Sequence, residues 1–430
     1  MTKEIKFSLI TLTFVATTIL VFLSEWIQEN WSVNFPLGFR HLLIIALFVG
    51  NWFFFGNKIQ LPKKYKLGIL LMGGYLSVAY FFSIAPIFNY ILGVFFTFLF
   101  VFLFIIGSNT NTRSEVIIGI FKYLILYFFL MSIVPILQGI ITGTSLRDIP
   151  VYFRELGAFG AVMNISTIIS LTLYIITSNK KYLYLAVFFS FGVMMTILKK
   201  TMISNVLVWI FYFFYLANSR TKLRFIIISF VILILGNFFI GRELNENIEE
   251  SNDYLDKFGP EEHVRLGMYI ACYNISTDYF PFGSGMGTFA SLSSIAGQYS
   301  PIYYDYGISN IGMNNPEDVA TGKHTLLDTY WPHIFGELGL VGTILFLFLW
   351  FFPFKLAMFN FKTTDDPFIK GVSFYILLLV ITMTWEGFTL YTPEIPGFVL
   401  LHSGLSGLCY FHLKAKETVF EELIDDNLIA

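Results

Sequence analysis

The stretch IFNYILGVFFTFLFVFLFIIG at residues 87–107 contains 21 residues and no charged side chain. A helix of about 20 residues crosses the roughly 30 Å of hydrocarbon in a bilayer. The strands of a membrane β-barrel would alternate apolar and polar residues over about ten positions, and this stretch is continuously apolar. It therefore predicts a membrane-spanning α-helix.

Similar apolar runs continue in both directions from this stretch. With it they make about a dozen, near residues 7–24, 40–56, 67–85, 87–107, 116–142, 158–178, 182–198, 201–217, 224–241, 334–356, 370–390 and 395–413. The predicted fold class is an all-α polytopic integral membrane protein with about 12 transmembrane helices and one large helical extracytoplasmic loop.

The composition of the 430-residue chain agrees with this fold class. Hydrophobic residues make up 56% and charged residues 13% of the chain, and the mean hydropathy is +0.70. Soluble proteins have about 25% charged residues, so a soluble enzyme and a disordered protein are both excluded. The net charge of −2 excludes a strongly basic nucleic-acid-binding protein. With only Cys272 and Cys409 present, a disulfide framework is not expected.

Lysine and arginine predict the orientation, because they concentrate in cytoplasmic connections. If the N-terminus is cytoplasmic, 18 of these residues lie on the inner side and 9 on the outer side, which accounts for all 27. Both termini are then cytoplasmic. Residues 1–241 carry helices one to nine, 242–333 form the extracytoplasmic loop, 334–413 carry the last three helices, and 414–430 form a cytoplasmic tail.

The long loop has 4 basic and 13 acidic residues. Eight of the acids lie within residues 243–262, and we interpret that segment as solvated and mobile rather than as a cation site. A helix is expected to follow, because apolar residues recur at helical spacing from Val264 to Ile275. We expect its apolar side to lie on the membrane face.

Residues 196–201 join two apolar runs almost without a loop and include Lys199 and Lys200. Two interpretations are equally supported. Both lysines extend to the outer surface along their aliphatic stems, or they bind an anionic ligand such as a pyrophosphate.

Two motifs in the loop carry further candidates. Residues 281–289 contain Gly283, Gly285 and Gly287 at alternate positions, which permit tight turns and close approach to a ligand, although such a turn is structural more often than functional. His324 and Asp328 are spaced one helical turn apart, so the carboxylate would orient the imidazole. His333 receives little weight, because isolated histidines are common.

Other site chemistries lack their motifs. The chain has no His-Glu-x-x-His or Cys-x-x-Cys pattern for zinc, no Asp-x-Asp for a metal-bound nucleotide sugar and no Gly-x-Ser-x-Gly elbow. We therefore predict neither a metal nor a cofactor.

Taken together, these features resemble the O-antigen ligase and Wzy-type polysaccharide polymerase superfamily. The loop signature of that family appears in order as Arg265, the glycine-rich turn Pro281–Phe289, His324 and the Glu-x-Gly-Leu-x-Gly segment Glu337–Gly342.

Two further elements resemble the family and also depart from it. Lys199–Lys200 stands where the family has Ser-Arg. Arg154 and Asn164 match another family element, but Met163 replaces the expected proline.

The resemblance implies a bacterial cytoplasmic-membrane glycosyltransferase that moves a glycan from undecaprenyl pyrophosphate, with inversion and without a metal. The acceptor would be the non-reducing sugar hydroxyl of a lipid-linked repeat unit. It implies pyrophosphate binding by Lys199, Lys200, Arg154 and Arg265, and catalysis by His324 as base together with Arg265. Supporting roles fall to Asp328, Gly283, Gly285, Gly287 and Glu337. The expected partners are the bilayer and the lipid-linked substrates, with a chain-length-regulating co-polymerase as a further candidate and no nucleic acid.

Two alternatives stay open. A ligase of the same superfamily would transfer the glycan to another acceptor. A transporter of lipid-linked oligosaccharide, which is not an enzyme, would need charged residues buried in its helices or helices broken at the midplane.

Overall fold

A computed structural model describes residues 3–30, 38–55, 58–143, 146, 156–216, 264–295, 299–311, 314–320, 325–389 and 392–413. Within these ranges every extended regular element is a helix. Two of the site residues predicted from the sequence, Arg154 and His324, and the apolar run 224–241 lie outside the described residues.

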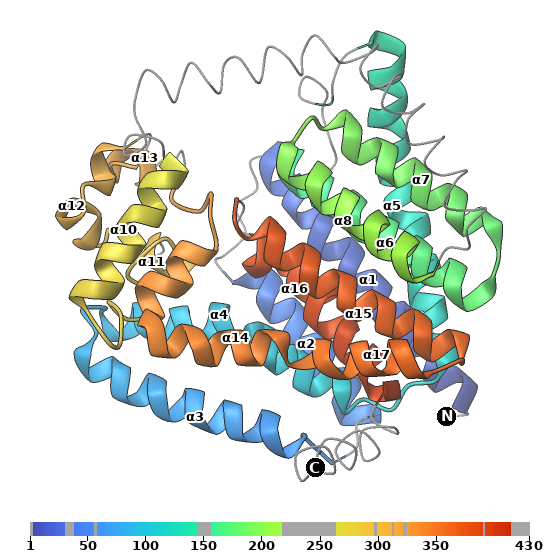
Figure 1. Cartoon of the computed structure of the whole chain (residues 1–430), viewed down its shortest axis with the longest axis horizontal. Coiled ribbons are helices and arrows are strands. Elements are labelled where there is room, and N and C mark those ends of the chain that lie inside the picture. The colour runs from blue at the N-terminus through green and yellow to red at the C-terminus, as the bar shows by residue number, and fades with distance from the viewer. Residues whose placement is uncertain are drawn as a thin grey trace.

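The first half of the chain forms eight described helices (Figure 1). They are α1 (Lys3–Asn30), α2 (Phe39–Phe55), α3 (Lys63–Ala79) continued by the 3₁₀ turn η1 (Tyr80–Phe82), α4 (Ile87–Ser108), α5 (Ser114–Thr142), α6 (Leu156–Thr177), α7 (Lys180–Met195) and α8 (Lys199–Tyr215).

The described part of the loop and the C-terminal part contain the remaining elements. The loop has α10 (Val264–Asp278), α11 (Leu292–Ile295), α12 (Ile302–Asp305), η3 (Ile308–Asn310) and α13 (Pro316–Ala320). After it come α14 (Trp331–Thr363), α15 (Pro367–Glu386), η4 (Thr392–Glu394), α16 (Pro396–Val399), the π-helical turn η5 (Leu400–Leu405) and α17 (Ser406–Leu413).

Local sequence explains several helix boundaries. The Asn179 side chain accepts a hydrogen bond from the Lys181 N–H at the start of α7, and Asp366 caps α15 in the same way. Gly143 ends α5 in the left-handed conformation. The last apolar run forms a continuous helical segment, Pro396–Leu413, that contains the π-helical turn η5.

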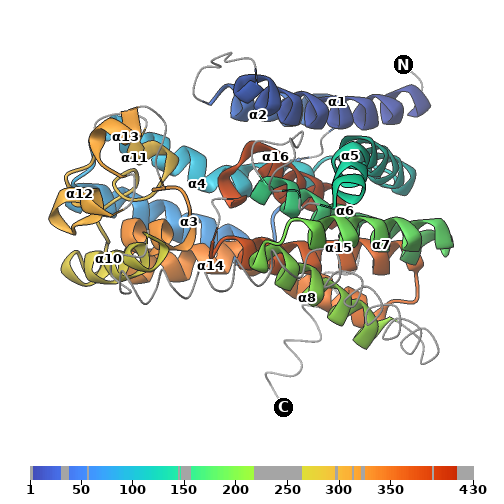
Figure 2. The same cartoon turned by 90° about the horizontal axis from the view of Figure 1, so that it is seen from above.

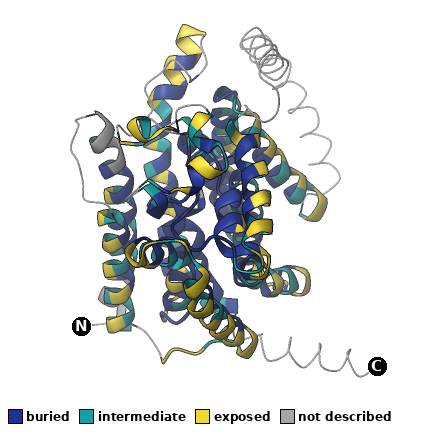
Figure 3. Cartoon of the chain, turned by 90° about the vertical axis from the view of Figure 1, so that its left-hand side faces the viewer, coloured by how far each residue is buried: buried dark blue, intermediate teal, exposed yellow. Residues whose placement is uncertain are grey.

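Helices α6 and α15 form the centre of the bundle. Every residue of α6 from Ala158 to Leu173 is buried, and so is every residue of α15 from Gly371 to Val380. Figure 2 shows α1 and α2 as an outer layer on one face, with α8 on the opposite face. Figure 3 shows that exposed residues are concentrated on the outward faces of the helices. Helices α6 and α15 are therefore enclosed on all sides by other parts of the bundle.

Six described helices are long and apolar enough to cross a membrane, namely α3 with η1, α4, α5, α6, α14 and α15. Shorter apolar segments lie at Leu9–Ser24 and Phe39–Phe55. Helices α7 and α8 have 16 and 17 residues. The structure thus shows a helical architecture suited to a membrane, while the total of about 12 spans and their orientation stay predictions.

The bundle has two chemically different ends. At one, which we call the basic end, the α2–α3 and α4–α5 connections meet: the Asn111 N–H donates to the Phe55 carbonyl oxygen at 3.1 Å, and Lys58, Lys63 and Arg113 are nearby in sequence. At the other, the loop end, α14 begins, α15 ends and α8 begins. There the Tyr330 N–H donates to the Gly387 carbonyl oxygen at 2.9 Å.

Candidate functional site at the loop end

The glycine-rich turn is wedged between α14 and the α3–α4 connection. The Ser284 and Gly285 N–H groups donate to the carbonyl oxygens of Gly336 and Glu337 at 3.0 and 3.1 Å. On the other side, the Ile84 N–H donates to the Ser284 carbonyl oxygen at 3.1 Å. The turn therefore attaches the loop to two helices of the bundle.

All three glycines of the turn have positive φ, at +71°, +97° and +80° in chain order. A Cβ on Gly283 would lie 2.6 Å from the Gly336 carbonyl oxygen. A Cβ on Gly285 would overlap the Ser83 side chain, and one on Gly287 would overlap the Asn89 backbone. The turn is thus filled by protein, and its glycines serve close packing.

Helix α14 is broken where this turn meets it. Gly339 has φ 60° and ψ −173°, which divides α14 into a short first arm and a long second arm. The Tyr75 hydroxyl donates to the carbonyl oxygens of Leu338 and, at 3.3 Å, of Pro281. The hydroxyl thus binds one carbonyl that the break exposes, and the break is sealed by protein groups.

Glu337 in the first arm organises the backbone after the glycine-rich turn. Its Oε1 accepts hydrogen bonds from the N–H groups of Thr288 and Phe289, both at 2.8 Å, and from the Ser291 hydroxyl at 2.7 Å. The side chain is buried. Three donors on one carboxylate oxygen make Glu337 a positioning residue for the loop.

The loop has its own small core, and this corrects one expectation. The predicted apolar face of α10 is buried, but against other loop residues and not against a membrane surface. The members of this core are Met268, Ala271, Cys272, Ile275, Phe289, Ala290, Ile302, Tyr303, Ile308 and Leu326. Burial raises the pKa of the Cys272 thiol to about 12, so the thiol is protonated at neutral pH.

Arg265 and Asp328 meet in the structure. The Arg265 Nη2 lies 3.7 Å from the Asp328 Oδ2, and both side chains are partly exposed. Residues 325–330 form turns, so the helix expected from the spacing of His324 and Asp328 does not extend over its described part. The described ionic partner of Asp328 is therefore Arg265, and the carboxylate can hold the guanidinium in place beside the loop core.

Lys199 and Lys200 are the first two residues of α8. Lys199 is exposed, whereas Lys200 is partly buried and donates from Nζ to the Thr389 carbonyl oxygen at 3.1 Å. A helix N-terminus already carries a partial positive charge, so two lysines there intensify a field that favours an anion.

The turn before these lysines is strained. Ile197 has φ 54°, a conformation that β-branched residues rarely adopt, and it is buried. Such a residue costs about 1–3 kcal/mol and persists only where its surroundings hold it.

A buried polar cluster lies directly beneath the lysines. The Asn164 Nδ2 donates to the Thr201 carbonyl oxygen at 3.0 Å and to the Glu386 Oε1 at 3.2 Å. The Asn205 Nδ2 donates to the Asn164 Oδ1 at 2.9 Å. Asn164 belongs to the sequence motif that begins at Arg154, and Thr201 directly follows Lys199 and Lys200. The structure thus brings these two predicted motifs into contact.

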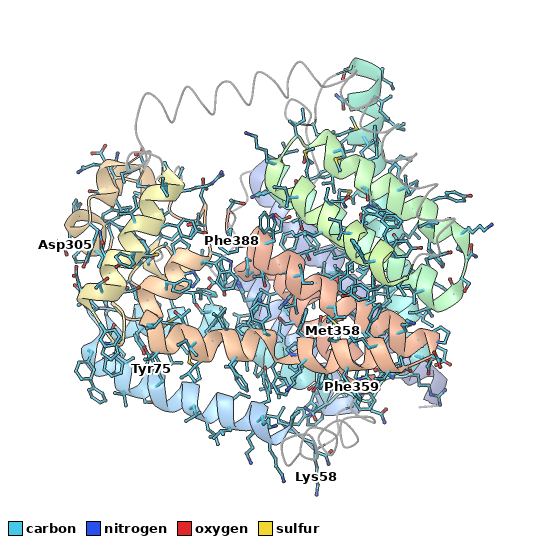
Figure 4. The ribbon with its side chains drawn as sticks, in the orientation of Figure 1. Lys58, Tyr75, Asp305, Met358, Phe359 and Phe388 are labelled. Atoms are coloured by element: carbon cyan, nitrogen blue, oxygen red, sulfur yellow. The ribbon has the colours of Figure 1, made fainter. Side chains whose placement is uncertain are left out.

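The segment after α15 joins α10 to α8. The Tyr269 hydroxyl, one turn along α10 from Arg265, donates to the Phe388 carbonyl oxygen at 2.9 Å, and the next carbonyl, of Thr389, accepts from Lys200. In Figure 4 Phe388 lies between the loop and the bundle. The cationic start of α8 and the arginine-bearing start of α10 therefore share one anchoring segment.

Sequence reasoning missed a second buried pair. The His333 Nε2 lies 3.2 Å from the Glu394 Oε1, which also accepts from the Thr97 hydroxyl at 2.9 Å. Both side chains are buried. His333 is therefore a buried structural residue at the start of α14, although its isolated position in the sequence gave it little weight. Glu394, an acid in the short connection between the last two apolar runs, was the available signal.

The loop end therefore combines exposed or partly exposed cations with a buried, hydrogen-bonded support. Such an arrangement can bind an anionic group next to the bundle. No protein-family model matches the chain, and no curated protein is similar enough in sequence to count as a relative.

Proposed function

We propose that the chain is a membrane glycosyltransferase that polymerises surface polysaccharide from undecaprenyl-pyrophosphate-linked repeat units. The observation that supports this most is the link between α8 and α10 through Phe388 and Thr389, because it gathers Lys199, Lys200 and Arg265 at one end of the bundle. A pyrophosphate needs accessible cations. Lys199 is exposed and has no described ion pair, and the Arg265 side chain stays 46% exposed although it lies 3.7 Å from Asp328.

The proposed reaction follows from the leaving group. An acceptor hydroxyl oxygen attacks the anomeric carbon from the face opposite the pyrophosphate, so the configuration inverts. The bond from the anomeric carbon to the pyrophosphate oxygen breaks, and its electron pair leaves with the lipid pyrophosphate. The lysines and Arg265 stabilise that charge as it develops, and His324 takes the hydroxyl proton.

A ligase that uses the same donor differs from the polymerase only in its acceptor. Deleting the gene and resolving the surface glycan on a gel distinguishes them. Single-repeat products are expected for a polymerase. Full-length chains that stay on the lipid carrier would indicate a ligase, and normal surface chains would refute both.

The transporter alternative has a specific observation in its favour. Helix α14 is broken, and Glu337, Glu386 and Glu394 are buried near helix ends, as a transporter requires. However, Gly339 at the break packs directly on the backbone of Gly283, with no space for a ligand between them. We therefore favour the enzyme. Accumulation of the lipid-linked unit on the cytoplasmic side after gene deletion would reverse this preference.

A further inference from the structure

Helix α10 is apolar on two opposite faces. One face is buried in the loop core through Met268, Ala271 and Ile275. The other exposes Leu266 at 39%, Ile270 at 36% and Tyr273 at 72%. Positions 266, 270 and 273 follow the i, i+4, i+7 spacing of one helical stripe, about half a turn away from the buried one. The structure therefore leaves an apolar stripe on α10 with no described cover.

Away from α10 the described loop surface is mixed: it exposes the aromatic rings of Phe280 and Tyr304 as well as polar and acidic residues. The exposed residues of its other short elements include Asp305, Asn310, Asn315 and Glu317. In Figure 4 Asp305 lies at the edge of the molecule farthest from the bundle. The loop as a unit thus has an acidic side and an apolar side, and α10 supplies the apolar side.

The stripe is adjacent to surface that a membrane would cover. Helix α10 rests on the start of α14, where the Ser276 hydroxyl donates to the carbonyl oxygen of Phe335 at 2.8 Å. Just beyond, α14 exposes Leu340, Val341 and Ile344, and α14 is one of the helices long enough to span a membrane.

Aromatic residues extend the apolar surface along the same end. Phe81 and Phe82 at the end of α3 and Phe280 after α10 are all exposed, and Phe82 stacks on Phe282 with ring centroids 4.7 Å apart. Aromatic side chains gather where a membrane protein meets the headgroup region. In Figure 1 α10 lies crosswise to α3 and to the long arm of α14, as expected for a helix in the membrane plane beside helices that cross it.

We infer that α10 is an interfacial helix whose Leu266–Ile270–Tyr273 stripe enters the headgroup and acyl boundary of the bilayer. The membrane then holds the loop from the side opposite its own core. Arg265, next to Leu266 in the chain, would sit at the depth of lipid phosphates. The inference depends on exposure and packing alone and holds for either enzyme or transporter.

The test is spin-label accessibility in the full chain, reconstituted into vesicles of phosphatidylethanolamine and phosphatidylglycerol. Nitroxides are attached to Ile270→Cys and Tyr273→Cys, with Glu317→Cys on α13 as the matched loop control. The native cysteines, both buried, stay in place, and the unsubstituted chain measures their background. Oxygen should relax the labels at 270 and 273 more strongly than a water-soluble nickel complex does, and the order should reverse at 317.

Two results would overturn the inference. If the nickel complex relaxes the labels at 270 and 273 as strongly as at 317, the stripe faces water. If oxygen and nickel are both excluded at 270 and 273, and dilution of the protein in the vesicles restores access, a second copy of the chain covers the stripe instead of lipid.

Discussion

Two neighbouring lysines at the loop end occupy different environments. Lys200 is tied to the Thr389 carbonyl and lies above the Asn164–Glu386 cluster, whereas Lys199 is exposed. The Lys200 ammonium already has a hydrogen-bond acceptor within the protein. Lys199 is therefore the residue whose charge is available to a ligand.

Lys199→Ala should lower the rate of glycan transfer by about ten- to a hundredfold, the equivalent of one charge-assisted hydrogen bond that tightens in the transition state. Lys199→Arg should retain part of the rate. The matched control is Lys180→Ala, an exposed lysine that begins α7 at the basic end. Turnover is measured with purified protein and a lipid-linked repeat unit. Equal rates for the two alanine variants would remove Lys199 from the anion site.

His324→Ala should lower the rate by about 10²- to 10⁴-fold if the imidazole accepts the hydroxyl proton. The unsubstituted enzyme should also lose rate as the pH falls, because a protonated imidazole cannot accept the hydroxyl proton. The residual rate of the variant should not show this decline. A variant with full activity would show that another group is the base or that none is needed. His333 is unsuitable as a control because it is buried against Glu394.

Two substitutions of Glu337 distinguish the contribution of its negative charge from that of its hydrogen bonds. Glu337→Ala leaves the N–H groups of Thr288 and Phe289 and the Ser291 hydroxyl without their acceptor, at about 1–3 kcal/mol for each buried donor. Glu337→Gln keeps an acceptor oxygen and should retain most of the stability. Thermal unfolding in detergent measures both. If the two variants unfold at the same temperature, the hydrogen bonds of Glu337 do not contribute to the stability of the protein.

At the scale of elements, the loop is attached to the bundle by direct backbone contact between the glycine-rich turn and α14. The glycine-rich turn and the broken α14 fit because neither Gly283 nor Gly339 has a side chain at the contact. The break and the turn therefore depend on each other, although 56 positions separate these two residues in the chain.

Gly283→Ala should destabilise this attachment more than Gly307→Ala does. The two glycines have nearly the same φ, +71° and +70°, so alanine carries the same cost of about 1–2 kcal/mol for the left-handed conformation at each. Only at Gly283 would the Cβ also meet backbone, since nothing lies within 4 Å at Gly307. Thermal unfolding and limited proteolysis of the loop measure the difference. Equal destabilisation by the two substitutions would mean that only the backbone conformation, and not the close contact with α14, requires glycine at position 283.

At the scale of the whole molecule, the two ends of the bundle differ in charge. The described basic end has Lys58 in the α2–α3 connection and further lysines at the start of α3, while the loop end carries the exposed acids of the loop together with Lys199 and Arg265. A protein inserted by the usual preference for cytoplasmic lysine would place the loop outside the cytoplasm.

Labelling of single cysteines tests that orientation. Glu317→Cys on α13 should react with a membrane-impermeant maleimide in intact or outer-membrane-permeabilised cells, and Lys64→Cys at the start of α3 should react only after the cytoplasmic membrane is opened. Both positions are exposed, and the unsubstituted chain is the background. The reverse pattern would invert the topology and place the proposed site in the cytoplasm.

The sequence by itself determined the helical class and the positions of most helices, because apolar length and capping residues act locally along the chain. It also singled out Lys199, Lys200, Arg265 and the glycine-rich turn, since charge on an apolar background is visible without coordinates.

Only the tertiary structure decided what these residues touch. Asn164 and Glu386 are 222 positions apart, and Glu337 is bonded to backbone 48 and 49 positions earlier. The pair His333–Glu394 and the second apolar face of α10 were also undetected by sequence. Contacts at such separations depend on how helices pack against one another, and hydrophobic periodicity identifies a buried face without identifying the partner that buries it.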